Sequence, residues 1–96
     1  MPDTADNTKV CSEVVLKNKL GLHARPAALF VRTASRYPCH ITVEKDGEEV
    51  NGKSIMGLMM LAAGMGSVLK ITASGEQAQE AVREIEQLIA RKFDED

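Results

Sequence analysis

Aromatic residues are scarce in this 96-residue chain, which has no tryptophan, one tyrosine and two phenylalanines. Proteins that bind single-stranded nucleic acid stack its bases on aromatic side chains, and proteins that bind duplexes are usually strongly basic. This chain has a net charge of −2, so its composition predicts no nucleic-acid partner. Its core must be built mainly from aliphatic side chains.

Long apolar runs and cysteines are also scarce. No run approaches the roughly 18–20 apolar residues of a transmembrane helix, and residues 1–8 lack the basic-then-apolar order of a signal peptide. We therefore expect a cytoplasmic protein with no membrane insertion. Two cysteines, Cys11 and Cys39, are too few for a disulfide framework, and the chain has no CxxC motif. The sequence predicts reduced thiols, no metal site and no bound cofactor.

The small net charge conceals two charged segments of opposite sign. Residues 9–36 contain six Lys or Arg residues and one acid, whereas residues 76–96 contain three Lys or Arg residues and seven acids. A basic segment of this kind favours acidic partner surfaces or phosphorylated groups. We therefore expect an acidic or phosphorylated partner near the first third of the chain.

Changes of hydrophobic period divide the chain into seven elements. Alternating apolar residues predict strands, and spacings of three and four predict helices. Strands are expected at 10–17, 39–45, 48–52 and 67–73, and helices at 24–36, 54–63 and 76–92. Together they predict one domain over 9–93, preceded by a flexible tail at 1–8 and followed by an acidic tail at 94–96. This β-α-β-β-α-β-α order predicts a two-layer α+β domain with helices on one face of a mostly antiparallel sheet.

The segment GLHARPA, residues 21–27, contains the clearest candidate for chemistry. His23 directly precedes the expected helix, whose first N–H groups have no partner within the helix and favour anions. A phosphoryl group on His23 would lie beside the amides of Ala24 and Arg25, and the Arg25 guanidinium matches phosphate oxygens. Gly21 allows close approach of the backbone. The residues alone leave two interpretations: a phosphoryl-accepting imidazole, or a histidine that only caps the helix beside a surface arginine.

Ser54 precedes a short apolar helix and is expected to cap it. A small single-sheet domain cannot bury a helix that is apolar around most of its circumference. The core side of this helix is expected to hold Leu58, Leu61 and Ala62. An exposed patch for partner proteins is expected at Ile55, Met56 and Met59, because flexible methionines suit several partners. The alternative is that this patch packs beneath the loop at 64–68.

The runs GLHARPA, ALFV and GKSIMGLMML together resemble the HPr family, the histidine-containing phosphocarriers of the phosphoenolpyruvate-dependent sugar phosphotransferase system. The resemblance implies an open-faced β-sandwich with strand order 1-4-2-3. It implies that His23 accepts phosphate at Nδ1 from phosphorylated enzyme I and passes it to IIA domains, with Arg25 beside the phosphate. Such a protein is a carrier and cosubstrate rather than an enzyme, and we expect a monomer. The docking surface for its partners is expected to include Leu29, Arg32, Ile55, Met56 and Met59.

The segment KSIMG around Ser54 resembles the regulatory-serine segment of HPr proteins that are modified by HPr kinase/phosphorylase. A phosphate there would lie at a helix start and oppose an acidic docking surface. The alternative interpretation is a mainly regulatory paralogue, either of catabolite-repression type with a transcription factor as partner or of nitrogen type. The ending FDED is similar to that of nitrogen-type paralogues. Dedicated regulatory relatives replace the active histidine, whereas His23 is retained here.

Overall fold

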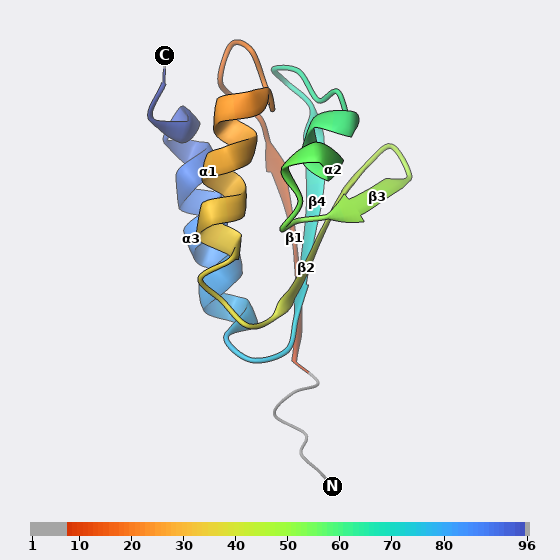
Figure 1. The fold of residues 1–96 in the computed structure, drawn as a ribbon, viewed down its shortest axis with the longest axis vertical. Helices are drawn as coiled ribbons and strands as arrows, with labels where there is room; N and C mark the ends of the chain where they lie inside the picture. The colour runs from red at the N-terminus through yellow and green to blue at the C-terminus, as the bar shows by residue number, and fades with distance from the viewer. Residues whose placement is uncertain (1–7, 96) are drawn as a thin grey trace, which may run out of the picture.

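The computed structural model describes residues 8–95, which form four strands, three α-helices and a final 3-10 helix. In chain order these are β1 (Lys9–Val15), α1 (Ala24–Ala34), β2 (His40–Lys45), β3 (Glu48–Asn51), α2 (Ile55–Met60), β4 (Val68–Ser74), α3 (Ala78–Ala90) and η2 (Lys92–Asp94) (Figure 1). The order of the strands and α-helices is the predicted one. The predicted flexible tail at 1–8 lies outside the described residues except for Thr8. No helix within the described part of the chain is long and apolar enough to span a membrane.

The strands form one antiparallel sheet in the order β1-β4-β2-β3, which confirms the order implied by the resemblance. Strand β4 lies between β1 and β2, so that Ala73 is opposite Val10 on one side and Ile41 on the other. This arrangement separates the strand that carries Cys11 from the strand that follows Cys39. Both cysteines are free, as predicted.

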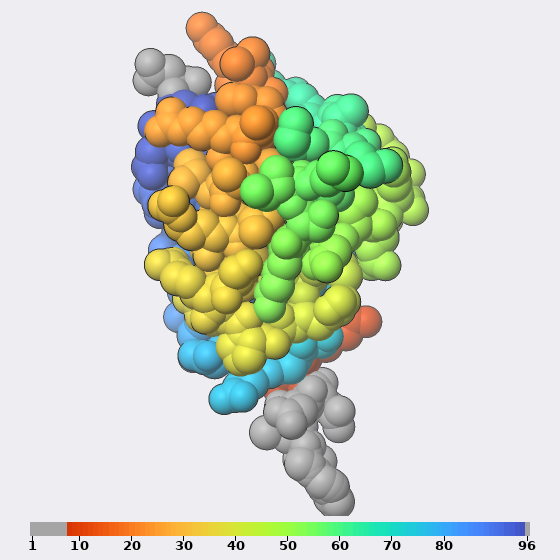
Figure 2. Space-filling view, viewed as in Figure 1, coloured from red at the N-terminus to blue at the C-terminus, as the bar shows by residue number. Residues whose placement is uncertain are grey.

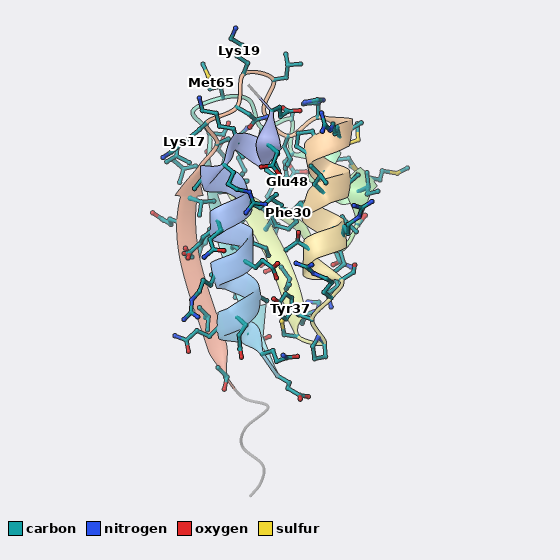
Figure 3. The ribbon with its side chains drawn as sticks, turned by 90° about the vertical axis from the view of Figure 1, so that its left-hand side faces the viewer. Lys17, Lys19, Phe30, Tyr37, Glu48 and Met65 are labelled. Carbon is teal, nitrogen blue, oxygen red and sulfur yellow. The ribbon has the colours of Figure 1, made fainter. Side chains whose placement is uncertain are left out.

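One face of the sheet is buried and the other faces solvent. On β4, Leu69, Ile71 and Ala73 are buried, whereas the side chains between them are exposed or half-buried. Helices α1 and α3 cover the buried face, and Phe30 lies between these helices and the sheet (Figures 1 and 3). The apolar residues on one side of α3 are all buried: Ala78, Ala81, Val82, Ile85, Leu88 and Ile89. The two-layer α+β architecture is therefore confirmed.

Helix α2 is shorter than predicted and ends at Met60. Leu58 and Leu61 are buried, as expected. The prediction that Ala62 faces the core is wrong, because its backbone is left-handed, with a φ of 50°, and its side chain is exposed. A left-handed residue cannot continue an α-helix, so the chain leaves the helical path before Ala62.

Candidate functional site

The loop between β1 and α1 is held against the loop that follows α2. The amide of Leu22 donates a hydrogen bond to the carbonyl oxygen of Ala63 at 2.8 Å. Gly21 has a φ of 65°, and a Cβ atom at this position would lie 2.2 Å from the same oxygen. Only glycine combines this left-handed backbone with such close contact. Gly21 therefore fixes where the next two residues leave the loop, as predicted from its place in the motif.

His23 is the N-cap residue of α1. Its backbone is extended (φ −85°, ψ −168°), and its carbonyl oxygen accepts the first helical hydrogen bond, from the Ala27 amide at 2.9 Å. The imidazole makes no cap hydrogen bond to the helix. The position at the helix start is therefore confirmed, and the side chain of His23 makes no capping hydrogen bond.

The imidazole of His23 instead contacts a carboxylate from the other end of the chain. Its Nε2 lies 3.2 Å from Oε1 of Glu95, and the two side chains are 36% and 18% exposed. The same Oε1 atom accepts a hydrogen bond from Nδ2 of Asn18 at 2.9 Å. Hydrogen bonds from Asn18 and then His23 lower the pKa of Glu95 from its ordinary value of 4.5, with the Arg25 charge adding to the effect. Glu95 is therefore ionised at neutral pH.

This contact determines the chemistry of the two ring nitrogens. A carboxylate only accepts hydrogen bonds, so Nε2 must carry the ring proton that faces Glu95. In the neutral imidazole, the lone pair then lies on Nδ1. Nδ1 is the nitrogen that the family resemblance assigns to phosphorylation. The nitrogen with the lone pair is thus the one that the resemblance assigns to phosphorylation.

The start of α1 provides a cationic environment beside His23. The amides of Ala24 and Arg25 belong to the first turn, where N–H groups have no acceptor within the helix. No acidic residue occupies this turn. The Arg25 side chain is exposed and forms no ion pair with any residue between 8 and 95. These groups suit an anion bound next to the ring.

The apolar side chains of α2 lie on the same face of the molecule as this site. Figure 2 shows the α1 region in orange and yellow beside the α2 region in green. Four α2 side chains line a hollow of about 560 Å³ and are 43–75% exposed: Ile55, Met56, Met59 and Met60. A second hollow, of about 310 Å³, is lined by His23 and Met59 together. The expected exposure is confirmed, and burial beneath the 64–68 loop is wrong.

The other two residues predicted for docking lie on α1. Arg32 is exposed, whereas Leu29 is half-buried and packs against the core. Leu29 therefore has a structural role in addition to any contact with a partner. Met60 was not predicted for the patch, although at 66% it is among its most exposed members.

Ser54 caps α2, as predicted from its place before the apolar run. Its Oγ accepts a hydrogen bond from the Gly57 amide at 3.0 Å. The residue is half-buried and directly precedes Ile55 and Met56 of the patch. A charge added to Ser54 would therefore lie at the border of the apolar surface.

Sequence reasoning missed Glu95, as it missed Asn18, which binds the same carboxylate. Glu95 is 72 residues from His23, and no motif links the two. The available signal was Phe93, an aromatic residue in an otherwise polar ending, which is fully buried. An apolar residue of that kind indicates that the chain end packs on the domain.

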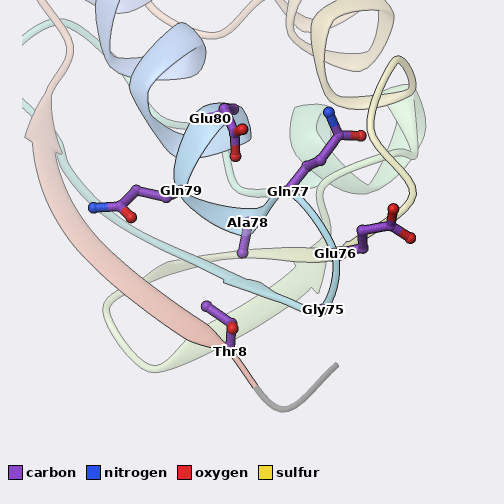
Figure 4. A pocket seen from close by; sticks show the side chains of 7 residues that line it. All are labelled: Thr8, Gly75, Glu76, Gln77, Ala78, Gln79 and Glu80. Atoms are coloured by element: carbon purple, nitrogen blue, oxygen red, sulfur yellow. The ribbon is translucent and has the colours of Figure 1, made fainter. Parts of the chain in front are cut away.

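A further hollow, of about 550 Å³, lies at the start of α3, at the end of the molecule away from the start of α1 (Figures 1 and 4). It is lined by Thr8 and residues 75–80. None of the residues predicted for the site lies there. The candidate site is therefore confined to the start of α1, the α2 surface and the chain end.

Comparison with known proteins identifies the family. A family model described as the PTS HPr component phosphorylation site matches residues 10–91. The chain is 52% identical over 84 residues to phosphocarrier protein HPr of Pseudomonas aeruginosa, covering 86% of this chain and 93% of that protein. Its structure is similar to HPr-C-His from Thermoanaerobacter tengcongensis (TM-score 0.88, 49% identity, covering 91% and 98% of the two chains). It is also similar to the swapped dimer of Crh, the Bacillus subtilis catabolite repression protein (TM-score 0.70, 46% identity, covering 82% and 91%). This chain therefore belongs to the HPr family, the phosphocarrier proteins of the phosphotransferase system.

Proposed function

We propose that this protein carries a phosphoryl group on Nδ1 of His23, accepting it from phosphorylated enzyme I and passing it to IIA domains in the cytoplasm. The observation that carries the proposal is the environment of the His23 ring. Nε2 faces the Glu95 carboxylate, while the ring lies at the start of α1 with the Arg25 charge nearby. This arrangement favours a nucleophilic Nδ1 beside groups that attract phosphate.

Transfer to His23 is a simple exchange of one P–N bond for another. The Nδ1 lone pair attacks phosphorus, the Nδ1–P bond forms, and the P–N bond to the enzyme I histidine breaks. The amides of Ala24 and Arg25 and the Arg25 guanidinium would stabilise the phosphoryl oxygens. Neither a cofactor nor a metal ion enters this step. The protein acts as a cosubstrate of other proteins and does not itself turn over a small molecule.

We assign partner docking to the surface that α1 and α2 form beside His23. An apolar patch close to cationic side chains suits an acidic surface with an apolar centre. Brief contacts with two different partners also suit methionine, whose side chain adapts to several surfaces. The proposed docking residues are Leu29, Arg32, Ile55, Met56 and Met59.

A regulatory role is the second candidate function, and it rests on Ser54. The residue caps α2 at the border of the patch, so a phosphate there would add negative charge where acidic partners dock. HPr kinase/phosphorylase would supply the phosphate, and a transcription factor would bind the product. Incubation with this kinase and ATP should yield phosphoserine in the wild type and none in Ser54→Ala. Failure to modify the wild type would remove this role. A wild type that is not modified would favour the nitrogen-type paralogue. Phosphate labelling that is faster with nitrogen-type enzyme I than with sugar-type enzyme I would identify such a paralogue.

The carrier function is tested by incubation with phosphoenolpyruvate and enzyme I. We expect one acid-labile phosphate per chain in the wild type and in His40→Ala, because His40 is exposed on β2 and remote in sequence from the site. His23→Ala should accept none. Equal labelling of the His23→Ala protein would contradict the proposal. Size-exclusion chromatography with light scattering tests the proposed monomer, and a dimer mass would contradict it.

A further inference from the structure

The apolar patch on α2 is built mainly from side chains that can be oxidised. Three of the four side chains that line its hollow are methionines, here called the α2 methionines: Met56, Met59 and Met60. Their exposed fractions are 75%, 43% and 66%. The fourth side chain, Ile55, has no polar atom, so the lining owes its apolar character to three thioethers and one hydrocarbon. The surface proposed for docking therefore presents oxidisable sulfur to solvent.

Met59 connects this patch to the histidine. It lines the α2 hollow and also the second hollow, of about 310 Å³, which His23 lines. A sulfoxide at Met59 would add an oxygen with a partial negative charge at the edge of the hollow that the ring shares. The same change would therefore alter both the docking surface and the surroundings of the proposed phosphoryl group.

We propose that the α2 methionines form a reversible oxidation site, through which peroxides slow the phosphorylation of His23. The proposal rests on the carrier function and the docking surface proposed above. Oxidation converts a flexible apolar thioether into a polar, chiral sulfoxide, and this change disrupts interfaces that are rich in methionine. A partner that binds the patch would have to remove water from each sulfoxide oxygen, which costs free energy unless a new hydrogen bond forms.

The chemistry in both directions needs only a peroxide and a dithiol. In the oxidation, the thioether sulfur attacks one oxygen of hydrogen peroxide, the S–O bond forms, the O–O bond breaks, and the second oxygen leaves as water. Sulfur loses two electrons and the peroxide gains them. In the reduction, a methionine sulfoxide reductase returns the thioether, while two thiols become a disulfide and the sulfoxide oxygen leaves as water.

The chain contains two internal controls. Met65, in the loop after α2, is 62% exposed but does not line the patch (Figure 3). It should be oxidised as readily as the α2 methionines, without an effect on transfer. Cys11 is an exposed free thiol that peroxide also oxidises. Dithiothreitol alone reverses the first oxidation products of a thiol, whereas a sulfoxide requires the reductase enzyme, so the two kinds of damage are separable.

Two leucine variants separate oxidation on α2 from oxidation elsewhere. The triple variant Met56→Leu, Met59→Leu and Met60→Leu keeps an apolar patch of similar volume without sulfur, and Met65→Leu is its matched control. Each protein is treated with hydrogen peroxide, reduced with dithiothreitol and assayed for phosphorylation by enzyme I, and peptide mass spectrometry locates the added oxygens. We expect kcat/KM of the oxidised wild type and of oxidised Met65→Leu to fall about ten-fold, as when an interface loses one well-packed side chain. The triple variant should have the same rate before and after peroxide.

Further measurements complete the test. The melting temperature of the oxidised wild type should not change, because the modified side chains are exposed, and reductases for both sulfoxide epimers should restore its rate. Three results would overturn the proposal: sulfoxides on α2 with an unchanged rate, oxidation of Met65 while the α2 methionines stay reduced, or an equal loss of rate in the triple variant. A loss that the reductases do not repair would contradict its reversibility.

Failure of the carrier function would look different. In that case the wild type would accept no phosphate even before oxidation. Calorimetric binding of enzyme I to the reduced and the oxidised protein would then still decide the proposal, because it needs no phosphoryl transfer. Weaker binding after peroxide in the wild type, but not in the triple variant, would support it, and equal binding would overturn it.

Discussion

At the scale of single residues, the position of His23 depends on Gly21. Because Gly21 has no side chain, its loop can lie directly against the carbonyl oxygen of Ala63. The loop carrying the histidine crosses the loop after α2 at a distance that leaves no room for a Cβ atom. That contact connects the proposed phosphorylation site to the α2 surface, on which partners are proposed to dock. A larger residue would have to separate the two loops or strain the backbone.

Replacement of Gly21 by alanine should therefore destabilise the protein. We expect a loss of roughly 2–4 kcal/mol in the free energy of unfolding, from the left-handed backbone and the collision with Ala63. Chemical denaturation measures this loss. Gly64→Ala is the matched control, because a Cβ atom there meets nothing within 4 Å, and its effect should stay within about 0.5 kcal/mol. Equal stabilities of the two variants would contradict this account of the loop.

At the scale of elements, α2 combines a buried side with an apolar side that faces solvent. Leu58 and Leu61 anchor it, while four neighbours line the hollow on its outer side. The sequence predicts this division because a small single-sheet domain can bury only one side of a short apolar helix. It does not predict where the helix ends, since the left-handed turn at Ala62 depends on the loop contact with residues 21–22 rather than on local propensity.

Removal of one apolar side chain from the patch should weaken partner binding without weakening the fold. Met56 is 75% exposed, so Met56→Gln should leave the melting temperature unchanged. We expect it to lower kcat/KM for phosphorylation by enzyme I about five-fold or more, the effect of losing roughly 1 kcal/mol at an interface. Met65→Gln is the control, because Met65 is 62% exposed but does not line the patch. Identical kinetics for the two variants would contradict the assignment of docking to α2.

At the scale of the whole molecule, the C-terminal end of the fold returns to the loop that carries His23. The acidic ending looks like a tail in the sequence, yet η2 places Phe93 in the core and Glu95 against His23. The buried stripes and His23 follow from periodicity and a short motif, which are local signals, whereas the sheet order was implied by the resemblance to the HPr family. Glu95 and Asn18 follow from neither, because their contact joins residues 77 positions apart. The opposite charges of the two segments are therefore partly brought together by the fold.

Phe93 should be essential for holding the chain end against the domain. Phe93→Ala removes a fully buried aromatic side chain and is expected to cost about 3–5 kcal/mol in the free energy of unfolding. It should also release Glu95 and shift the 15N resonances of the His23 ring in the molecules that remain folded. Phe93→Leu, which keeps most of the volume, should lose much less stability and keep the wild-type ring shifts. A Phe93→Ala protein as stable as the wild type would show that the chain end is not anchored.

The central claim is that Nδ1 of His23 is the phosphoryl acceptor while Nε2 keeps its proton. It is tested most directly by 15N and 31P NMR of protein labelled with 15N-histidine and phosphorylated by phosphoenolpyruvate and enzyme I. The account predicts a phosphorus coupled to Nδ1 of His23 and a protonated Nε2 in the same ring. Phosphate on Nε2, on His40 or on a serine would contradict it.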